Sequence, residues 1–312
     1  MNMTQPSEHT SNVIPLKNFD ERFSDWRTRV EMFLQEALTF GPDAPDHIAE
    51  AMRYTVMAPG KRFRPILVLA ACEAVGGNVE WAFPAAAAVE VIHSYTLIHD
   101  DLPAMDNALT RRGQLTSHKV YGESMAILAG DALNTLAFQI IAEHNLALNV
   151  PSFLTVRVMG ELAKALGVEG VVGGQVVDIE SVGKEITIDQ ITYIHSHKTA
   201  ALFEASVRAG AILGGCSESV LAAVTGYATH LGLAFQIVDD LLDVEGDPET
   251  TGKDGGLDAQ AGKPTFPSVV GVPKARAFAR EEAGRARESA APLGSAAATL
   301  LEIVDYVIER ES

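Results

Sequence analysis

The sequence predicts an all-α protein. Apolar residues recur at spacings of three and four, several alanine-rich apolar segments are too long for strands, and alternating apolar and polar residues are scarce. The 312 residues, 47% of them hydrophobic, suffice for a large buried core in one or two domains. Because no linker divides the chain, we expect a single domain over residues 19–312. Residues 1–18 are polar and unpatterned, which predicts a disordered tail.

The expected helices follow one another along the chain. An amphipathic pattern covers 19–58 and breaks at 41–45, where the sequence reads GPDAP. A buried helix over 65–75 is expected to end at the glycine pair that follows it. We interpret KEITIDQIT, at 184–192, as a loop that leads into a helix rather than as a strand. Further helices are expected over 81–99, 124–144, 152–166, 188–214 and 217–244, and in the tail from residue 274.

Composition restricts the partners and the compartment. The net charge of −17 opposes binding to nucleic acid. No uninterrupted apolar run reaches the roughly 18 residues of a membrane helix, so no transmembrane segment is expected. The first residues lack the basic and apolar regions of a secretion signal. Cys72 and Cys216 lie in apolar, helix-like settings, which favours buried thiols over a disulfide and a cytoplasmic location.

The segment LIHDDLPAMDNALTRRG gathers charges at the end of an apolar run. Adjacent carboxylates repel each other unless a cation lies between them, and carboxylate oxygens without nearby Cys indicate a hard ion such as Mg²⁺. Guanidinium groups suit the phosphate oxygens that complete such a site. The alternative is an exposed acidic helix end with an ordinary ion pair. The charged residues are Asp100, Asp101, Asp106, Arg111 and Arg112.

A proline separates the first two of these aspartates from the third. Six residues after Asp100, Asp106 cannot share its face of one straight helix. Pro103 disfavours helical geometry at the residue before it. We therefore expect the helix to end or kink there and to bring Asp106 back towards Asp100.

A second acidic segment, FQIVDDLLD, repeats the pattern further along the chain. Its polar residues are spaced by three and four, which places them on one helix face, and no lysine follows until Lys253. The two segments together predict two walls of one metal–phosphate site. The polar residues of the second segment are Gln236, Asp239, Asp240 and Asp243.

Seven motifs stand in a fixed order between about residues 57 and 267. They are GKRFRP (60–65), HSYTLIHDDLPAMD (93–106), RRG (111–113), GGQVVDIE (173–180), HKT (197–199), FQIVDDLLD (235–243) and GKDGGLDAQAGKPTFP (252–267). Through them the chain resembles the short-chain trans-isoprenyl diphosphate synthases, most of all the bacterial farnesyl diphosphate synthases. The resemblance implies a homodimeric helical bundle with a central cavity.

The resemblance also implies a reaction. An allylic diphosphate, dimethylallyl or geranyl, ionises as its pyrophosphate leaves, isopentenyl diphosphate attacks the carbocation, and a proton is lost to give farnesyl diphosphate. Stabilising the departing pyrophosphate is then the main task of the protein and its metals. The family is thought to use the released pyrophosphate as the base, so no side-chain nucleophile is needed.

The family's site residues carry over to matching positions here. Three Mg²⁺ are implied, two on Asp100 and Asp106 and a third on Asp239, with Asp101, Asp240 and Asp243 as supporting or water-mediated ligands. The residues implied for isopentenyl diphosphate are Lys61, Arg64, His93 and Arg112. Those implied for the allylic diphosphate are Arg111, Lys198, Thr199, Gln236, Lys253 and Lys263. Those expected to carry catalysis are Asp100, Asp101, Asp106, Arg111, Lys198 and Asp239.

Some of these residues have a plainer interpretation when they are taken alone. Lys61 and Arg64 are typical of charges at a helix entry, and His93 and His99 of hydrogen-bonded core histidines. The glycine-rich stretch 252–262 is interpreted as a lid that orders over substrate. Asn107, Ala108 and Leu109 stand where close relatives carry further acidic residues, which puts water-mediated metal binding there in question.

Two positions before the first aspartates are expected to set product length. Tyr95 lies five residues before Asp100, about 7.5 Å back along a helix, where a bulky ring would stop the growing tail. Thr96 beside it adds little room. Family experience associates an aromatic residue here with a farnesyl product, so farnesyl ranks first, geranylgeranyl second and geranyl third; Tyr95 as a plain core residue is the alternative.

Other functions remain open at this point. A terpene cyclase of the same fold generally carries a different second metal motif, with Asn, Ser or Thr, and Glu at wider spacing. A catalytically inactive partner subunit of a prenyl synthase, or a helical interaction protein, tends to lose one metal motif. Both motifs are present here, which favours chain elongation.

Overall fold

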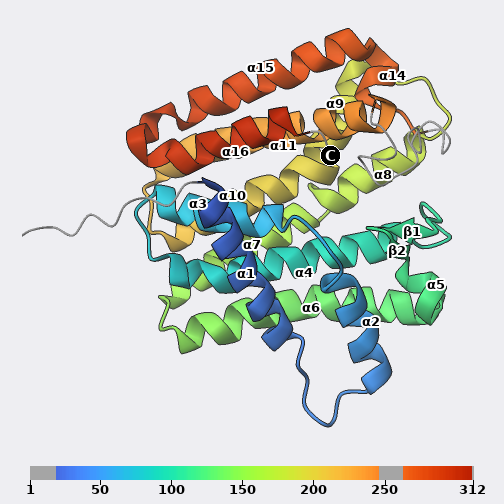
Figure 1. The fold of residues 1–312 in the computed structure, drawn as a ribbon, viewed down its shortest axis with the longest axis vertical. Coiled ribbons are helices and arrows are strands. Elements are labelled where there is room, and N and C mark those ends of the chain that lie inside the picture. The colour runs from blue at the N-terminus through green and yellow to red at the C-terminus, as the bar shows by residue number, and fades with distance from the viewer. Residues whose placement is uncertain (1–18, 246–262, 311–312) are drawn as a thin grey trace, which may run out of the picture.

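The described part of the chain folds into a bundle of helices that carries a short hairpin (Figure 1). The computed structural model describes residues 19–245 and 263–310. Its helices are α1 Phe19–Ala37, α2 Asp46–Val56, α3 Phe63–Ala74, η1 Val79–Ala82, α4 Phe83–Asp100, α5 Ser117–Tyr121, α6 Glu123–Ala147, α7 Ser152–Leu166, α8 Val171–Ser181, α9 Ile188–Ile194, η2 His195–Ala200, α10 Ala201–Leu213, α11 Glu218–Glu245, α14 Phe266–Val270, α15 Val272–Ala290, η3 Ala291–Ala297 and α16 Ala298–Glu309.

The core lies around three central helices. Almost every residue of α3 is buried, as are most of α4 and α10, which agrees with their alanine-rich, apolar sequences. In packing order, α6 lies against α4, α4 against α3, α3 against α10, α10 against α11, and α11 against α15. The small side chains of α3 and α4 let these central helices approach closely.

Most of the expected helices are confirmed, with corrected ends. The break at 41–45 separates α1 from α2, and KEITIDQIT is a loop followed by α9, whose Thr187 and Gln190 form a capping box. The segment expected as one helix over 188–214 instead contains a π-helical turn, η2, between α9 and α10. Helices α5, α8 and α14 and the hairpin were not predicted.

The hairpin places two arginines beside the end of α4. Strands β1 (Thr110–Arg111) and β2 (Gln114–Leu115) pair antiparallel, and Arg111 lies opposite Gln114. The turn between them is Arg112–Gly113, with φ of 53° and 76°. Positive φ at both positions is the geometry of the tight type I′ hairpin turn. In Figure 1 this hairpin, α8 and α14 lie on one side of the molecule, where the site described below is found.

Three helical stretches would reach across a membrane by length and apolar composition alone: Glu123–Ala147, Glu218–Glu245 and Val272–Glu309. Less than half of the apolar window of each is buried in this chain. The expected absence of a transmembrane segment and the expectation of one domain stay predictions. The proposed tail 1–18 lies outside the described residues.

Candidate active site

The first acidic motif forms at the end of α4. The helix ends at Asp100, and after Pro103 the chain turns so that the backbone N–H of Asp106 donates to the Asp100 carbonyl at 2.9 Å. A second bond, from the N–H of Asn107 to the Leu102 carbonyl at 3.0 Å, closes the same turn. Asn107 takes a positive φ of 49°, which asparagine tolerates better than most residues. The predicted return of Asp106 towards Asp100 is confirmed.

Asp100 and Asp106 lie in a site that favours a cation. Burial, opposed by Lys198 and reinforced by the neighbouring Asp106 carboxylate, raises the pKa of Asp100 to about 6. Lys263 Nζ lies 2.8 Å from Asp106 Oδ2. Burial alone would lower the pKa of Lys198, but Asp100 and Asp178 outweigh it and raise this pKa. Two lysine ammonium groups therefore supply the positive charge that the two carboxylates require.

The middle aspartate of this motif has a different partner. Asp101 is only 4% exposed and accepts hydrogen bonds from Arg111 Nε at 2.8 Å and Nη2 at 2.6 Å. This fork-shaped pair ties strand β1 to the end of α4. Asp101 and the predicted diphosphate ligand Arg111 thus bind each other, which gives Asp101 an anchoring role; its role as a supporting or water-mediated metal ligand stays a prediction.

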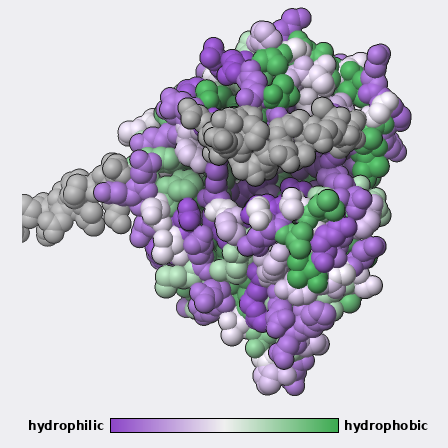
Figure 2. Space-filling model, turned by 45° about the vertical axis from the view of Figure 1, so that its right-hand side comes forward, coloured by the Kyte–Doolittle hydropathy of each residue, from purple (hydrophilic) through white to green (hydrophobic). Residues whose placement is uncertain are grey.

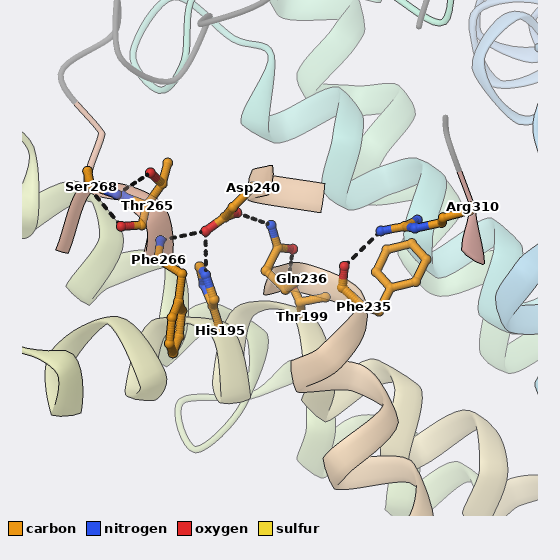
Figure 3. Close-up of polar contacts among 9 residues, drawn as sticks. All are labelled: His195, Thr199, Phe235, Gln236, Asp240, Thr265, Phe266, Ser268 and Arg310. Atoms are coloured by element: carbon orange, nitrogen blue, oxygen red, sulfur yellow. Dashed lines mark hydrogen bonds and ion pairs between the residues drawn. The ribbon is translucent and has the colours of Figure 1, made fainter. Parts of the chain in front are cut away.

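The second acidic motif divides in the same way, and Figure 3 shows the contacts of its Asp240. Asp240 is 3% exposed; its Oδ2 accepts from the backbone N–H of Phe266 at 2.8 Å and lies 2.8 Å from His195 Nε2. Its Oδ1 accepts from Gln236 Nε2 at 2.9 Å. Asp240 thereby joins α11, η2 and α14, and both of its oxygens are used inside the protein. Its expected role as a supporting or water-mediated metal ligand stays a prediction.

Asp239 is the presented member of the second pair. Its side chain is 49% exposed, and Arg310 Nη2 lies 3.5 Å from its Oδ1. Arg310 itself donates to the Phe235 carbonyl at 2.8 Å and stacks on the Phe235 ring (Figure 3). Asp243 follows one turn later along α11. The spacing predicted that these aspartates share one helix face. They do not all share it, because Asp240 turns into the core while Asp239 does not.

Consecutive residues of η2 join the two walls. Lys198 faces Asp100, and the hydroxyl of Thr199 donates to Gln236 Oε1 at 2.8 Å, one turn before Asp240. Lys198 Nζ is also held by Asp178 of α8 at 2.6 Å. Figure 2 shows hydrophilic side chains gathered in a hollow on this side of the molecule. Both acidic segments hence border one polar cleft.

A glycine sets the distance between α8 and this turn. A Cβ added to Gly174 would lie 2.3 Å from the backbone nitrogen of Lys198, closer than any side chain permits. The glycine pair of GGQVVDIE therefore serves close backbone packing.

A basic pocket adjoins the acidic cleft. Burial and then Arg64 and Arg112 hold the pKa of His93 well below its usual value, so His93 is neutral. Burial lowers the pKa of Arg64 to about 10, while Glu90 and Asp239 oppose that change. Within the described chain, Arg64 Nε and Arg112 Nη1 are buried without a hydrogen-bond partner. Such donors indicate that an anion binds here.

Tyr95 lies beneath the first aspartates. It is 9% exposed, and burial followed by the charge of Asp100 raises its pKa to about 12. Its ring meets the His99 ring edge-on at 5.8 Å. His99 in turn lies 3.1 Å from the Ile127 carbonyl of α6, which fits the interpretation as a packed histidine. Thr96 donates to the His93 carbonyl of its own helix at 2.8 Å.

The donor set fits magnesium better than a softer ion. Among residues 19–245 and 263–310, no group of three or more Asp, Glu, His or Cys side chains stands close enough to enclose a metal. Asp100 and Asp106 offer oxygen alone, and Mg²⁺ commonly takes its remaining ligands from water and phosphate. The Lys263 ammonium group, 2.8 Å from Asp106, shows that this pair attracts positive charge.

Several residues of the site escaped the sequence analysis. Asp178 and Arg62 stand inside quoted motifs but were given no role, and both prove to be held by buried ion pairs. Glu90, His195 and Arg310 carry no motif signal, because their contacts come from distant parts of the chain. Lys253 and the proposed lid 252–262 lie outside the described residues, so both stay predictions.

Comparison with known proteins gives the family. The profile of the family described as polyprenyl synthetase matches residues 45–299. The chain is 45% identical over 294 residues to a dimethylallyltranstransferase of Fischerella ambigua, covering 94% of this chain and 84% of that protein. It is 45% identical over 265 residues to a farnesyl diphosphate synthase of Geobacillus stearothermophilus, covering 84% and 89%.

Two further proteins show the range of the family. The large subunit 1 of a heterodimeric chloroplastic geranylgeranyl pyrophosphate synthase of Arabidopsis thaliana is 47% identical over 272 residues, covering 86% of this chain and 73% of that protein. A geranyltransferase of Helicobacter pylori, solved with magnesium and an isoprenyl diphosphate, superposes with a TM-score of 0.82 at 31% identity, covering 94% and 97%. Together with the cleft described above, these matches show that the chain is a prenyltransferase of the polyprenyl synthetase family.

Proposed function

We propose that the protein is a farnesyl diphosphate synthase, which condenses isopentenyl diphosphate with dimethylallyl and then geranyl diphosphate. The observation that supports this product is the buried Tyr95 ring below Asp100, which would limit the depth available to the hydrocarbon tail. A geranylgeranyl product is the second candidate, because relatives of similar identity make that product.

The residues of the cleft would perform the reaction by electrostatic stabilisation. Lys198 and Lys263, already beside Asp100 and Asp106, would neutralise the departing diphosphate as it separates from the allylic carbon. Three Mg²⁺, held by Asp100, Asp106 and Asp239, would polarise that diphosphate when bound. Arg64, Arg112 and Lys61 would hold isopentenyl diphosphate with its double bond towards the same carbon.

No protein base stands out in the basic pocket. His93 is buried among arginines, and its lowered pKa makes it a poor proton acceptor. We therefore assign the final proton to the released pyrophosphate. Thr199 and Gln236, bonded to each other between the two walls, would present oxygen dipoles to the developing carbocation.

An assay of the purified protein tests the function. Labelled isopentenyl diphosphate should be incorporated with dimethylallyl and with geranyl diphosphate when Mg²⁺ is present, and not after chelation. Absence of incorporation from either allylic substrate would favour an inactive partner subunit. A cyclic product without uptake of isopentenyl diphosphate would favour a terpene cyclase.

Substitution of Tyr95 tests the product. Tyr95→Ala should lengthen the main product beyond farnesyl, because it empties space below Asp100, as measured by chromatography of the dephosphorylated alcohols. The matched control is Tyr121→Ala, which removes an aromatic ring from a cluster with Tyr54 and His47 away from the cleft. Unchanged chain length in Tyr95→Ala would contradict the proposed farnesyl limit.

We also propose a homodimer that covers the outer face of α6 and α7. Large apolar side chains are exposed on both helices. The sequence of α6 is apolar enough for a fully buried helix, yet less than half of its apolar window is buried in this chain. Light scattering should give twice the chain mass, and Leu128→Lys with Phe153→Lys should give monomers. The exposed apolar residues of the face are Ile127, Leu128, Leu146, Phe153 and Val156.

We propose a cytoplasmic location as well. Cys72 and Cys216 are both free thiols, and burial raises the pKa of Cys72 to about 12, which makes it unreactive. Such thiols suit a reducing compartment. Fractionation of cells that express the full chain tests this location.

A further inference from the structure

A buried acid in the middle of α4 faces the basic pocket rather than the metal cleft. Glu90 is 2% exposed and stands one turn before His93. Its Oε1 lies 2.9 Å from Arg62 Nη1 and 3.7 Å from Arg112 Nη2. A carboxylate this deeply buried requires such partners, because an isolated charge would be expelled or neutralised.

The two arginines reach Glu90 from separate segments of the chain. Arg62 directly precedes α3, and Arg112 is the first residue of the turn between β1 and β2. Both have left-handed backbones, with φ of 52° and 53°. Residues with a side chain hold this conformation only where their surroundings impose it. For Arg112 that constraint is the type I′ turn of the hairpin, and the shared carboxylate of Glu90 holds both arginine side chains.

The same two guanidinium groups enclose a glycine. A Cβ added to Gly60 would lie 3.0 Å from Arg112 Nη1 and 3.4 Å from Arg62 Nη1. The loop before α3 and the hairpin turn are therefore in close contact, with Glu90 beneath both. A small displacement of Arg62 would move Lys61, the residue before it, and Arg64, which lies two residues after it in the first turn of α3.

Arg62 differs from its neighbours in where its donors point. It donates to Glu90 and, at 3.0 Å, to the Ala58 carbonyl, and its Nε lies 3.6 Å from Glu31. Arg62 Nε has no hydrogen-bond partner in the part of the chain that the structure describes, and the same holds for the buried Arg64 Nε and Arg112 Nη1. Both terminal nitrogens of Arg62 thus bond inside the protein, whereas among the described residues the terminal nitrogen Nη1 of Arg112 is buried without a partner.

We propose that Glu90, through Arg62 and Arg112, is the positioning residue of the isopentenyl diphosphate subsite. It touches no substrate itself. It holds the loop before α3 and the hairpin turn at the spacing that one diphosphate group can bridge, and it balances part of the positive charge there. The inference rests on the proposed function, because it assigns isopentenyl diphosphate to this pocket.

Binding of each substrate alone tests the proposal. Titration calorimetry with isopentenyl diphosphate, and separately with geranyl diphosphate and Mg²⁺, is compared for the wild type, Glu90→Ala and Arg62→Ala. We expect the Kd for isopentenyl diphosphate to rise about tenfold or more in both variants, and the Kd for geranyl diphosphate to change less than about twofold. In steady-state assays KM for isopentenyl diphosphate should rise far more than kcat falls.

A double variant separates positioning from simple support of the fold. Arg62→Met combined with Glu90→Leu replaces a buried ion pair by apolar groups of similar size, which proteins often tolerate. The folded double variant should still bind isopentenyl diphosphate weakly. Glu73→Gln, which removes the partner of Arg22 at the far end of α3, serves as the matched control and should bind like the wild type.

Three outcomes would count against the proposal. Wild-type affinity in the folded single variants, or restored affinity in the double variant, would overturn it. Equal weakening of both substrates would also overturn it, since that result indicates a general loss of structure. Failure of the wild type itself to bind isopentenyl diphosphate would instead overturn the proposed function, and with it this assignment.

Discussion

The two acidic motifs look alike in sequence but occupy unlike surroundings. Asp100, at the end of α4, is enclosed beside Asp106 and has a pKa raised to about 6. Asp239, in the middle of α11's last turns, has a side chain that is 49% exposed, with Arg310 3.5 Å away. The first motif thus buries a carboxylate whose ionised form is disfavoured there, whereas the second exposes its carboxylate to solvent.

The motifs agree in how they use the second aspartate of each pair. Asp101 is bound by Arg111, and Asp240 by Gln236 and by the Phe266 N–H. Neighbours on a helix point about 100° apart, so one member of each pair turns into the protein as the other faces the cleft. Each pair of adjacent aspartates therefore combines one carboxylate that faces the cleft with one that anchors the fold. The two sites differ in what surrounds the cleft-facing carboxylate, which is enclosed at Asp100 and exposed at Asp239.

The largest expected effect compares the two presented aspartates. Asp100→Asn should lower kcat/KM about a thousandfold and Asp239→Asn about a hundredfold, because the first removes charge from the more enclosed site. Steady-state assays at saturating Mg²⁺ measure both. Equal losses would mean that burial of the first site adds nothing to catalysis.

The next effect concerns an anchor. Asp240→Asn should lower the free energy of unfolding by about 3 kcal/mol, since the amide places a donor opposite existing donors and leaves one unpaired. Urea denaturation measures this. Asp239→Asn is the matched control, and its exposed position predicts a change within about 0.5 kcal/mol. A stable Asp240→Asn protein would contradict the anchor role.

A third prediction is that a substitution in the cleft raises the free energy of unfolding, whereas most substitutions lower it. The folded-state pKa of Asp100, about 6, lies above its ordinary value of 3.8, so the folded protein binds this proton more tightly than the unfolded chain does. Stability of the metal-free protein therefore falls as pH rises from 4 to 6. Asp100→Asn removes that loss and should stabilise the metal-free protein by about 3 kcal/mol at pH 7.

Thermal and urea unfolding in the presence of a chelator check this third prediction. Asp239→Asn should show no such gain. A destabilised Asp100→Asn protein would show that the attraction between this carboxylate and the two lysines, Lys198 and Lys263, outweighs the free-energy cost of burying the carboxylate.

The smallest expected effect is a pH dependence. Below about pH 6 the proton on Asp100 competes with Mg²⁺, so the Mg²⁺ concentration for half-maximal activity should rise about tenfold for each further pH step of one. Activity measured against Mg²⁺ between pH 5 and 8 tests this. A flat requirement over that range would place the titrating group elsewhere.

Much of this arrangement could be predicted from local sequence. Helical periodicity located most of the bundle, and Pro103 predicted the return of Asp106, because a proline acts on the backbone within its own neighbourhood. The seven collinear motifs predicted which charges would meet. These are signals that a short stretch carries by itself or that a family shares.

The anchors could not be predicted, since they depend on distant partners. Helical spacing placed Asp239 and Asp240 together, but the direction of Asp240 depends on His195 and on the backbone of Phe266. Helix α8 was missed because its glycines weaken the helix signal. Its packing against η2 overrides that weakness, and sequence alone gives no view of such a contact.

The contact between α8 and η2 also makes Gly174 a control point. A single methyl group there would push on the backbone nitrogen of Lys198 and so carry the ammonium group away from Asp100, without altering any ionisable residue. Replacement of one Cα hydrogen of Gly174 by a methyl group should therefore slow this enzyme while its charge pattern stays unchanged.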